Sequence, residues 1–243
     1  MFFKDLHKYL ASVLFPVFCV SCSSEGQWWC VVCQKQYPFL SEVSCPVCSV
    51  PTTQGKICNS CSAVSPLLGL TALFNYDETA PPAKLIKALK YQGAADSGQV
   101  WVKIFKDYLT EHKPPWLTAG DVTQKSVSII PVPLHPKREL RRGFNQAQVL
   151  GTHLVSVLGE DSGVQLLVDG LYRIKDTPQQ ARLNGVERRQ NLKEAFCWQK
   201  NVAPERVVLL DDVFTTGSTM LECARVLKNA GTQEVWGLVI ARG

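Results

Sequence analysis

The sequence predicts an α/β protein built around a parallel sheet and preceded by a separate metal-binding module. Three observations carry this prediction. From residue 65 onward, apolar runs of strand length alternate with amphipathic stretches of helix length. One of these runs, residues 207–210, leads directly into two carboxylates and a turn rich in hydroxyl groups. Eight of the ten cysteines, by contrast, lie within the first 61 residues.

The composition fits a globular chain of 243 residues, which is long enough for one large or two modest domains. Apolar residues make up 46% of the chain and support a real core, but no apolar run is long enough for a transmembrane helix. The formal charge of +5 permits a polyphosphate or nucleic-acid partner without requiring one. The amphipathic N-terminus lacks a signal-peptide cleavage pattern. We therefore expect a cytoplasmic protein without membrane insertion.

The N-terminal cysteines form four C-x₂-C pairs. Such a pair places two thiolates on one side of a tight turn, at the separation that a tetrahedral metal needs, and two pairs complete one site. We therefore predict two structural zinc ions, held by Cys19, Cys22, Cys30, Cys33, Cys45, Cys48, Cys58 and Cys61.

Disulfides, redox-active thiols and iron–sulfur clusters fit these pairs less well than zinc does. Disulfides require an oxidising compartment, redox-active pairs usually occur once, and hairpin-length loops between paired knuckles favour zinc over an iron–sulfur cluster. Sequential pairing would join the first four cysteines in one site and the last four in the other, but a cross-braced arrangement stays open. Cys197 and Cys223 have no partner at ligand spacing and are expected to be small buried residues.

We place a domain boundary between a metal-binding module, residues 1–64, and an α/β domain, residues 65–243. The module is expected to depend on metal for its fold. In the second domain, strands are predicted at 70–76, 127–133, 207–210 and 235–241, and helices at 82–91, 99–112, 145–158 and 218–229. Residues 113–125 are predicted to be a polar linker, and residues 176–190 a mobile loop. This order indicates right-handed crossovers between parallel strands, with the strand 235–241 closing the sheet.

The strongest functional signal is the segment 207–219. Asp211 and Asp212 are expected at the exposed C-terminal tip of the strand, where open α/β sheets bind ligands. Amides and hydroxyl groups at the helix start that follows suit a phosphate, and Gly217 would permit an unusual φ there. The carboxylates suit ribose hydroxyls or a Mg²⁺ ion about a sugar's length away. The turn consists of Thr215, Thr216, Gly217, Ser218 and Thr219.

This segment resembles the phosphoribosyl pyrophosphate (PRPP) motif of type I phosphoribosyltransferases. The resemblance implies a phosphoribosyltransferase-like domain that binds PRPP with Mg²⁺. Asp211 and Asp212 would hold the ribose hydroxyls, and residues 215–219 would hold the 5′-phosphate. In the 6-oxopurine branch of that family, an Asp about three residues after the acidic pair acts as general base, but this chain has Thr215 there. This departure argues against a purine-salvage enzyme and leaves the catalytic residues unknown.

Two further segments are rich in cations. The loop after strand 127–133 is predicted to clamp pyrophosphate, because Arg forks bind phosphate oxygens in pairs; its cations are Lys137, Arg138, Arg141 and Arg142. A second cluster resembles the flexible lid that closes over PRPP in phosphoribosyltransferases; it contains Arg182, Arg188, Arg189 and Asn191. For both segments, a solvated surface loop is the alternative.

Together these motifs resemble the ComF/GntX family, in which a double zinc ribbon precedes a phosphoribosyltransferase-like domain. The resemblance covers nearly the whole chain and rests on the four C-x₂-C pairs and on residues 85–91, 131–133, 141–146, 188–192 and 207–219. It implies a bacterial protein that acts in natural competence or in the use of external DNA.

We therefore expect a PRPP-binding, phosphoribosyltransferase-like protein whose nucleophile the sequence does not name. Two alternatives stay open. One is a sensor of PRPP or a nucleotide without catalysis, which fits Thr215. The other is an adaptor of the transformation machinery that binds single-stranded DNA and works with competence or recombination proteins. In that adaptor Trp28, Trp29 and Phe39 would stack on bases, although packing around the zinc sites is the favoured role of these residues.

Overall fold

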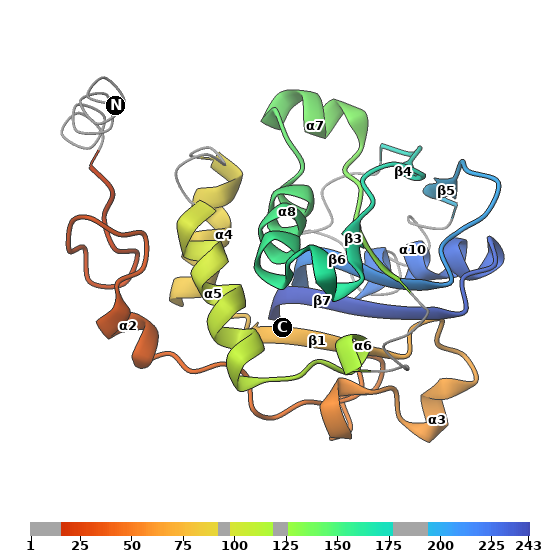
Figure 1. The fold of residues 1–243 in the computed structure, drawn as a ribbon, viewed down its shortest axis with the longest axis horizontal. Coiled ribbons are helices and arrows are strands. Elements are labelled where there is room, and N and C mark those ends of the chain that lie inside the picture. Colours follow the sequence, from red (N-terminus) through yellow and green to blue (C-terminus); the bar gives the residue numbers. More distant parts are fainter. Residues whose placement is uncertain (1–15, 92–97, 119–125, 177–193) are drawn as a thin grey trace.

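The centre of the computed structural model, which describes residues 16–91, 98–118, 126–176 and 194–243, is a five-stranded sheet (Figure 1). The order is β1–β7–β6–β2–β3, and all neighbouring strands run parallel. The α/β prediction is therefore confirmed. The strands are β1 (Gly69–Asn75), β2 (Val127–Pro131), β3 (Val164–Leu166), β6 (Arg206–Phe214) and β7 (Glu234–Arg242).

The sheet is buried on both faces, which explains why its strands read as continuous apolar runs. Residues 207–210 of β6 are at most 1% exposed. Val207 and Leu209 belong to one hydrophobic cluster, and Val208 and Leu210 belong to another, because successive side chains of a strand point to opposite faces.

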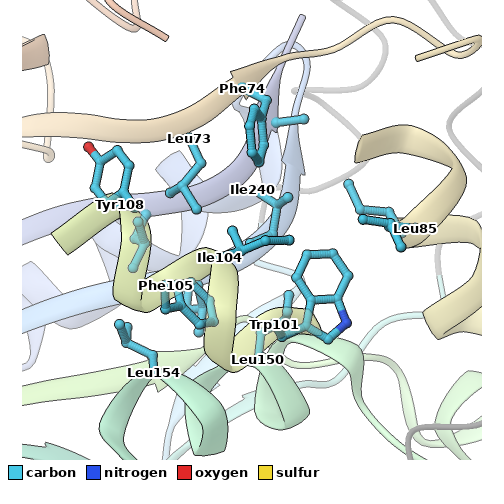
Figure 2. Close-up of a cluster of buried hydrophobic side chains, with 14 of the residues drawn as sticks. Leu73, Phe74, Leu85, Trp101, Ile104, Phe105, Tyr108, Leu150, Leu154 and Ile240 are labelled. Atoms are coloured by element: carbon cyan, nitrogen blue, oxygen red, sulfur yellow. The ribbon is translucent and has the colours of Figure 1, made fainter. Parts of the chain in front are cut away.

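Helices cover the two faces. On the first face α5 packs against α8, and α4 adds Leu85 to the same hydrophobic cluster; Figure 2 shows Leu85 and Trp101 of this cluster together with Ile240 of β7. On the second face α10 packs against β6 and β7. The four predicted helices are confirmed, including the Asn145 side chain, which caps α8 by accepting from Ala147 N. The helices of this domain are α4 (Pro81–Tyr91), α5 (Gly98–Glu111), α6 (Pro115–Thr118), α7 (Pro136–Arg142), α8 (Gln146–Leu158) and α10 (Ser218–Asn229).

The fold differs from the sequence prediction in four places. The expected linker contains the helix α6. Its Trp116 is buried, and Trp116 Nε1 donates to Thr71 Oγ1 at 3.2 Å, which fixes the helix against the sheet. The expected basic loop forms the helix α7. The strand β7 lies inside the sheet rather than closing it. Four elements of three residues each were also missed, because so short a segment carries little periodicity. They are β3, η2 (Glu160–Ser162) and the antiparallel pair of β4 (Leu171–Arg173) and β5 (Phe196–Trp198).

The described part of the cysteine-rich stretch, residues 16–64, contains the short helices α2 (Val31–Lys35), η1 (Thr53–Gly55) and α3 (Asn59–Ser62), and it packs against the sheet. The Trp29 and Phe74 rings lie 5.6 Å apart, and Leu40 N donates to Leu73 O at 2.8 Å. In Figure 1, α2 lies beside α5, and α3 lies apart from it. The boundary at residue 65 falls between α3 and β1 and stays a prediction. None of the helices formed by the described residues is long and apolar enough to cross a membrane.

Candidate functional site

A crevice for ligands is expected at the carboxyl ends of β2 and β6. The two strands are neighbours, but the chain leaves them in opposite directions. After β2 it continues through α8 to β3, and after β6 it continues through α10 to β7, on the other face of the sheet. In open α/β sheets, ligands bind at the strand ends where the connections diverge in this way.

The acidic pair lies on β6 just beyond the end of its pairing with β2. The prediction that it forms an exposed strand tip is wrong, because β6 continues to Phe214 along β7, where Phe214 pairs with Arg242. Pairing with β2, however, ends where Pro131 meets Leu210. Asp211 and Asp212 are therefore half-buried residues of β6 that lie beyond the last residue of β6 paired with β2.

The two carboxylates have different surroundings, as expected for successive strand residues. Asp212 forms an ion pair with Lys90 of α4, and its backbone N–H donates to Asp211 Oδ1 at 2.8 Å. Burial, reinforced by the neighbouring Asp212, raises the pKa of Asp211 to about 8. Burial therefore favours the protonated form of Asp211 near neutral pH.

The turn after β6 has the backbone of an anion cradle. Gly217 precedes α10 and takes φ +69°, as the sequence predicted. A Cβ atom at this position would overlap the Phe214 ring. Thr216 Oγ1 and Ser218 Oγ lie 2.9 Å apart, and Thr215 is exposed. Free amides of the first turn of α10 and these hydroxyl groups together suit a phosphate.

The basic segment after β2 is a capped helix. His135 Nδ1 accepts from Lys137 N at 3.3 Å, and Gly143 ends α7 with φ +87°. Because α7 follows β2, its cations reach the same edge of the sheet as the acidic pair. Lys137 and Arg141 are exposed, and Arg138 and Arg142 are half-buried. The predicted lid residues Arg182, Arg188, Arg189 and Asn191 lie outside the described residues.

Two charged residues near this edge were missed in the sequence. The repeated lysines Lys84, Lys87 and Lys90 suggest one basic helix face, but Lys90 follows buried Ile86 by four residues and therefore lies toward the core. Arg173 of β4 is 7% exposed, and its guanidinium lies 5.5 Å from the centre of the Phe196 ring.

Arg173 connects the groups around Asp211. Burial, and after it the positive charge of Arg138, lowers the pKa of Arg173. The nearby groups Asp176 and Asp211 raise this pKa. Arg173 is therefore a buried cation close enough to Arg138 of α7 and to Asp211 to interact electrostatically with both. No sequence pattern marks it, since β4 is too short to show which face Arg173 takes.

The eight N-terminal cysteines form two compact clusters, and the pairing is sequential. The sulfur atoms within each cluster all lie within 4.8 Å of one another. The Sγ atoms of Cys22 and Cys30 are 3.8 Å apart, and those of Cys48 and Cys58 are 3.5 Å apart. Four thiolates around one zinc ion are separated by about 3.8 Å, so both clusters fit a tetrahedral zinc site. The clusters are Cys19, Cys22, Cys30 and Cys33, and Cys45, Cys48, Cys58 and Cys61.

The local structure of the clusters favours thiolates at some positions. A hydrogen bond from Ser24 lowers the pKa of Cys22 to about 6. Burial opposes ionisation of Cys45, but the backbone N–H groups of Cys58 and Cys48 lower its pKa to about 6. Crowding by other thiols, Cys48 first, raises the pKa of Cys61 to about 12, and a divalent cation relieves such crowding because it binds thiolates.

The aromatic residues near the first cluster pack inside the protein. Trp29 is 2% exposed, and Phe39 stacks on Phe74 with ring centroids 5.2 Å apart. Trp28 is half-buried against the hydrophobic cluster that contains Trp29 and Phe74. Stacking of bases on Trp29 is therefore wrong, because its ring has no free face. Cys223 is buried as expected, whereas Cys197 is half-buried on β5.

Comparisons with known proteins agree with this architecture. The double zinc ribbon domain family matches residues 10–62. The DNA utilization protein YhgH of Escherichia coli O157:H7 is 33% identical over 219 residues, which cover 88% of this chain and 91% of that protein. The chain belongs to the ComF family.

Other relatives of this ComF protein carry competence names. Competence protein F of Haemophilus influenzae is 44% identical over 119 residues, which are 47% of this chain and 50% of that protein. Competence protein ComFC of Streptococcus pneumoniae is 24% identical over 209 residues, which cover 85% of this chain and 84% of that protein.

Proposed function

We propose that this ComF protein binds PRPP with Mg²⁺ in the crevice between β2 and β6 and acts in natural competence and DNA utilisation in the cytoplasm. The observation that supports the PRPP proposal is that three features suited to a phosphorylated ligand follow neighbouring strands at one sheet edge: the acidic pair, the Gly217 turn and the basic helix α7. The names of the relatives support the biological role.

In this proposal each feature binds one part of PRPP. The turn 215–219 holds the 5′-phosphate, and the acidic pair holds the ribose hydroxyls. Arg138, Arg141 and Arg142 of α7 hold the pyrophosphate, with Lys137 at the exposed start of the helix. Mg²⁺ would enter with the diphosphate, whose oxygens are its preferred ligands.

Catalysis would follow from the same arrangement. When the bond between the anomeric carbon and pyrophosphate breaks, negative charge grows on the leaving group, and the α7 cations stabilise it. The acceptor, which we take to be a nitrogen nucleophile, adds to the same carbon. Arg182 and Arg188 would cover the site as a lid.

A non-catalytic sensor is the second candidate, and Thr215 favours it. In the 6-oxopurine enzymes a carboxylate general base stands at this place, whereas Thr215 has no group that accepts a proton near neutral pH. Release of pyrophosphate in the presence of candidate bases separates the two functions. A protein that binds PRPP but releases no pyrophosphate with any base is a sensor.

The third candidate, a single-stranded DNA adaptor, receives little support from the zinc sites. In residues 16–64, Lys35 and Lys56 are balanced by Glu25 and Glu42. Four thiolates around each zinc ion leave a net negative charge. A groove for DNA would need a surplus of cations, so α7 is the better candidate surface. Dependence of DNA affinity on salt tests this function.

The decisive experiment is calorimetric titration of the protein with PRPP in the presence of Mg²⁺. The double variant Asp211→Asn/Asp212→Asn is expected to lose PRPP binding while remaining folded, and Asp169→Asn is the matched control. Asp169 is an exposed carboxylate that pairs with Lys200 at 2.9 Å and belongs to none of the three features of the proposed site. Unchanged PRPP affinity in the double variant would exclude the acidic pair as part of the site.

A further inference from the structure

Lys90 is a cation of α4 that lies next to the acidic pair of the proposed crevice. It lies in the last turn of α4, a helix anchored by buried Leu85, Ile86 and Leu89; Figure 2 shows Leu85 directed into the core. The Lys87 side chain is exposed, whereas the Lys90 side chain is only 25% exposed. The anchored helix therefore fixes where Lys90 can reach.

The partner of Lys90 is one half of the acidic pair. Its ammonium group contacts Asp212 Oδ2, and the Asp212 side chain is 13% exposed. Asp211 lies near Cys223 of α10, whose pKa is raised first by burial and then by the charge of Asp211. Because the Lys90–Asp212 pair is shielded from water, loss of either partner would leave a poorly solvated charge.

We propose that Lys90 is a positioning residue that acts through Asp212: it fixes this carboxylate and cancels its charge, so that the crevice accepts a ribose that carries a phosphate. A carboxylate without a nearby cation would repel the phosphate through the poorly screened edge of the sheet. The inference rests on the proposed function, since it concerns the same ligand. It adds a residue that neither the PRPP motif nor the basic helix contains.

The test is a double-mutant cycle on the binding of ribose 5-phosphate, measured by calorimetry in buffer without added Mg²⁺ and without chelator, so that the zinc ions stay bound and no added divalent cation replaces Lys90. Lys90→Met is expected to weaken binding by about tenfold or more, because a charge-assisted contact is lost and Asp212 is left uncompensated. Lys90→Arg keeps the charge and is expected to retain part of the affinity. In the Asp212→Asn background, Lys90→Met should cause little further loss.

The matched control is Lys87→Met, which removes the same charge from an exposed position on the same helix. Its affinity is expected to stay within about twofold of the wild type. A loss as large as that of Lys90→Met would overturn the inference, because the total charge of α4 would then be sufficient to explain it. Additive losses for Lys90→Met and Asp212→Asn would overturn it as well.

Unfolding of the same proteins in urea, without ligand, separates this inference from the proposed function. The unfolding free energies of the four members of the cycle are expected to be non-additive, which would verify the ion pair. If the wild type bound no ribose 5-phosphate although the pair was verified, the proposed function would fail, and Lys90 would have only a structural partner. If the wild type bound it and Lys90→Met bound equally well, the inference about Lys90 alone would fail.

Discussion

Gly217 is subject to two separate constraints at the start of α10. Its φ of +69° belongs to the left-handed region, and a Cβ atom would overlap the Phe214 ring. Gly163 has nearly the same φ, +68°, but open space where a Cβ would lie. The two glycines therefore separate the backbone effect from the steric one.

We expect Gly163→Ala to destabilise the protein by roughly 1–2 kcal/mol, the usual penalty for a side chain in this conformation. Gly217→Ala should add a further 1–3 kcal/mol or so, because the Phe214 ring must move. It should also weaken phosphate binding, since the turn would shift. Urea unfolding of both variants measures the difference. Equal destabilisation would mean that Phe214 does not restrict this turn.

Asp211 should make stability depend on pH. Its folded-state pKa of about 8 lies above the unfolded value of about 3.9, so the folded protein holds a proton that the unfolded chain releases. The resulting stabilisation is fully present below about pH 4 and is lost as pH rises through about 8. Asp211→Asn should flatten the fall in melting temperature over this range. An unchanged slope would show that Asp211 ionises normally.

At the scale of residues, the acidic pair and the φ of Gly217 could be predicted, because the local sequence determines them. Lys90 and Arg173 could not, because their contacts depend on which faces of the sheet α4 and β4 occupy. The burial of Asp211 also escaped prediction, since β6 continues past the expected end by pairing with β7.

The cations of α7 lie on one short helix, so in the proposed function they all contact the pyrophosphate. Substitutions in α7 should therefore weaken the contacts to pyrophosphate and spare those to the rest of the ligand. Arg138→Ala and Arg142→Ala should each weaken PRPP binding by about 1.5–3 kcal/mol, or about 10- to 150-fold, if each removes a contact to pyrophosphate. Binding of ribose 5-phosphate should change less, because it lacks the pyrophosphate. Calorimetry with both ligands measures the ratio.

Lys200→Ala serves as the control for α7, because it removes a positive charge that pairs with Asp169 on the surface. Equal losses of PRPP and ribose 5-phosphate affinity would indicate a structural role for α7. If α7 bound DNA instead, the same substitutions would leave PRPP affinity unchanged. They would then reduce the salt dependence of single-strand binding by about 0.7 in slope per lost contact.

At the scale of elements, long helices with a buried face could be predicted, and α10 was predicted with the observed bounds. None of the α7 residues is buried, so the helix has no apolar periodicity that would reveal it. Pro136 at its start and the His135 cap are the signals that could have found it. The strands β3, β4 and β5 depend on pairing partners far away in the chain.

At the scale of the whole molecule, the cysteine-rich stretch is attached to the sheet at several points. Arg242 at the end of β7 donates to Ser44 O at 2.8 Å and to Cys45 O at 3.0 Å. Ile57 N donates to Leu68 O at 2.9 Å, just before β1 begins. The sequence could predict the zinc ligands, because their spacing is local, but not these long-range contacts. The stretch should therefore unfold together with the sheet.

The last prediction tests this coupling. Purified protein should contain about two zinc ions per chain, and Cys45→Ser should lose one of them. Because Cys45 O accepts from Arg242, loss of the second cluster should also lower the melting temperature of the sheet, in a single transition. Cys197→Ser, outside both clusters, should keep both ions and the wild-type transition. Calorimetric melting that showed two transitions, with the sheet at its wild-type temperature, would mean that the zinc-binding stretch folds independently of the α/β domain.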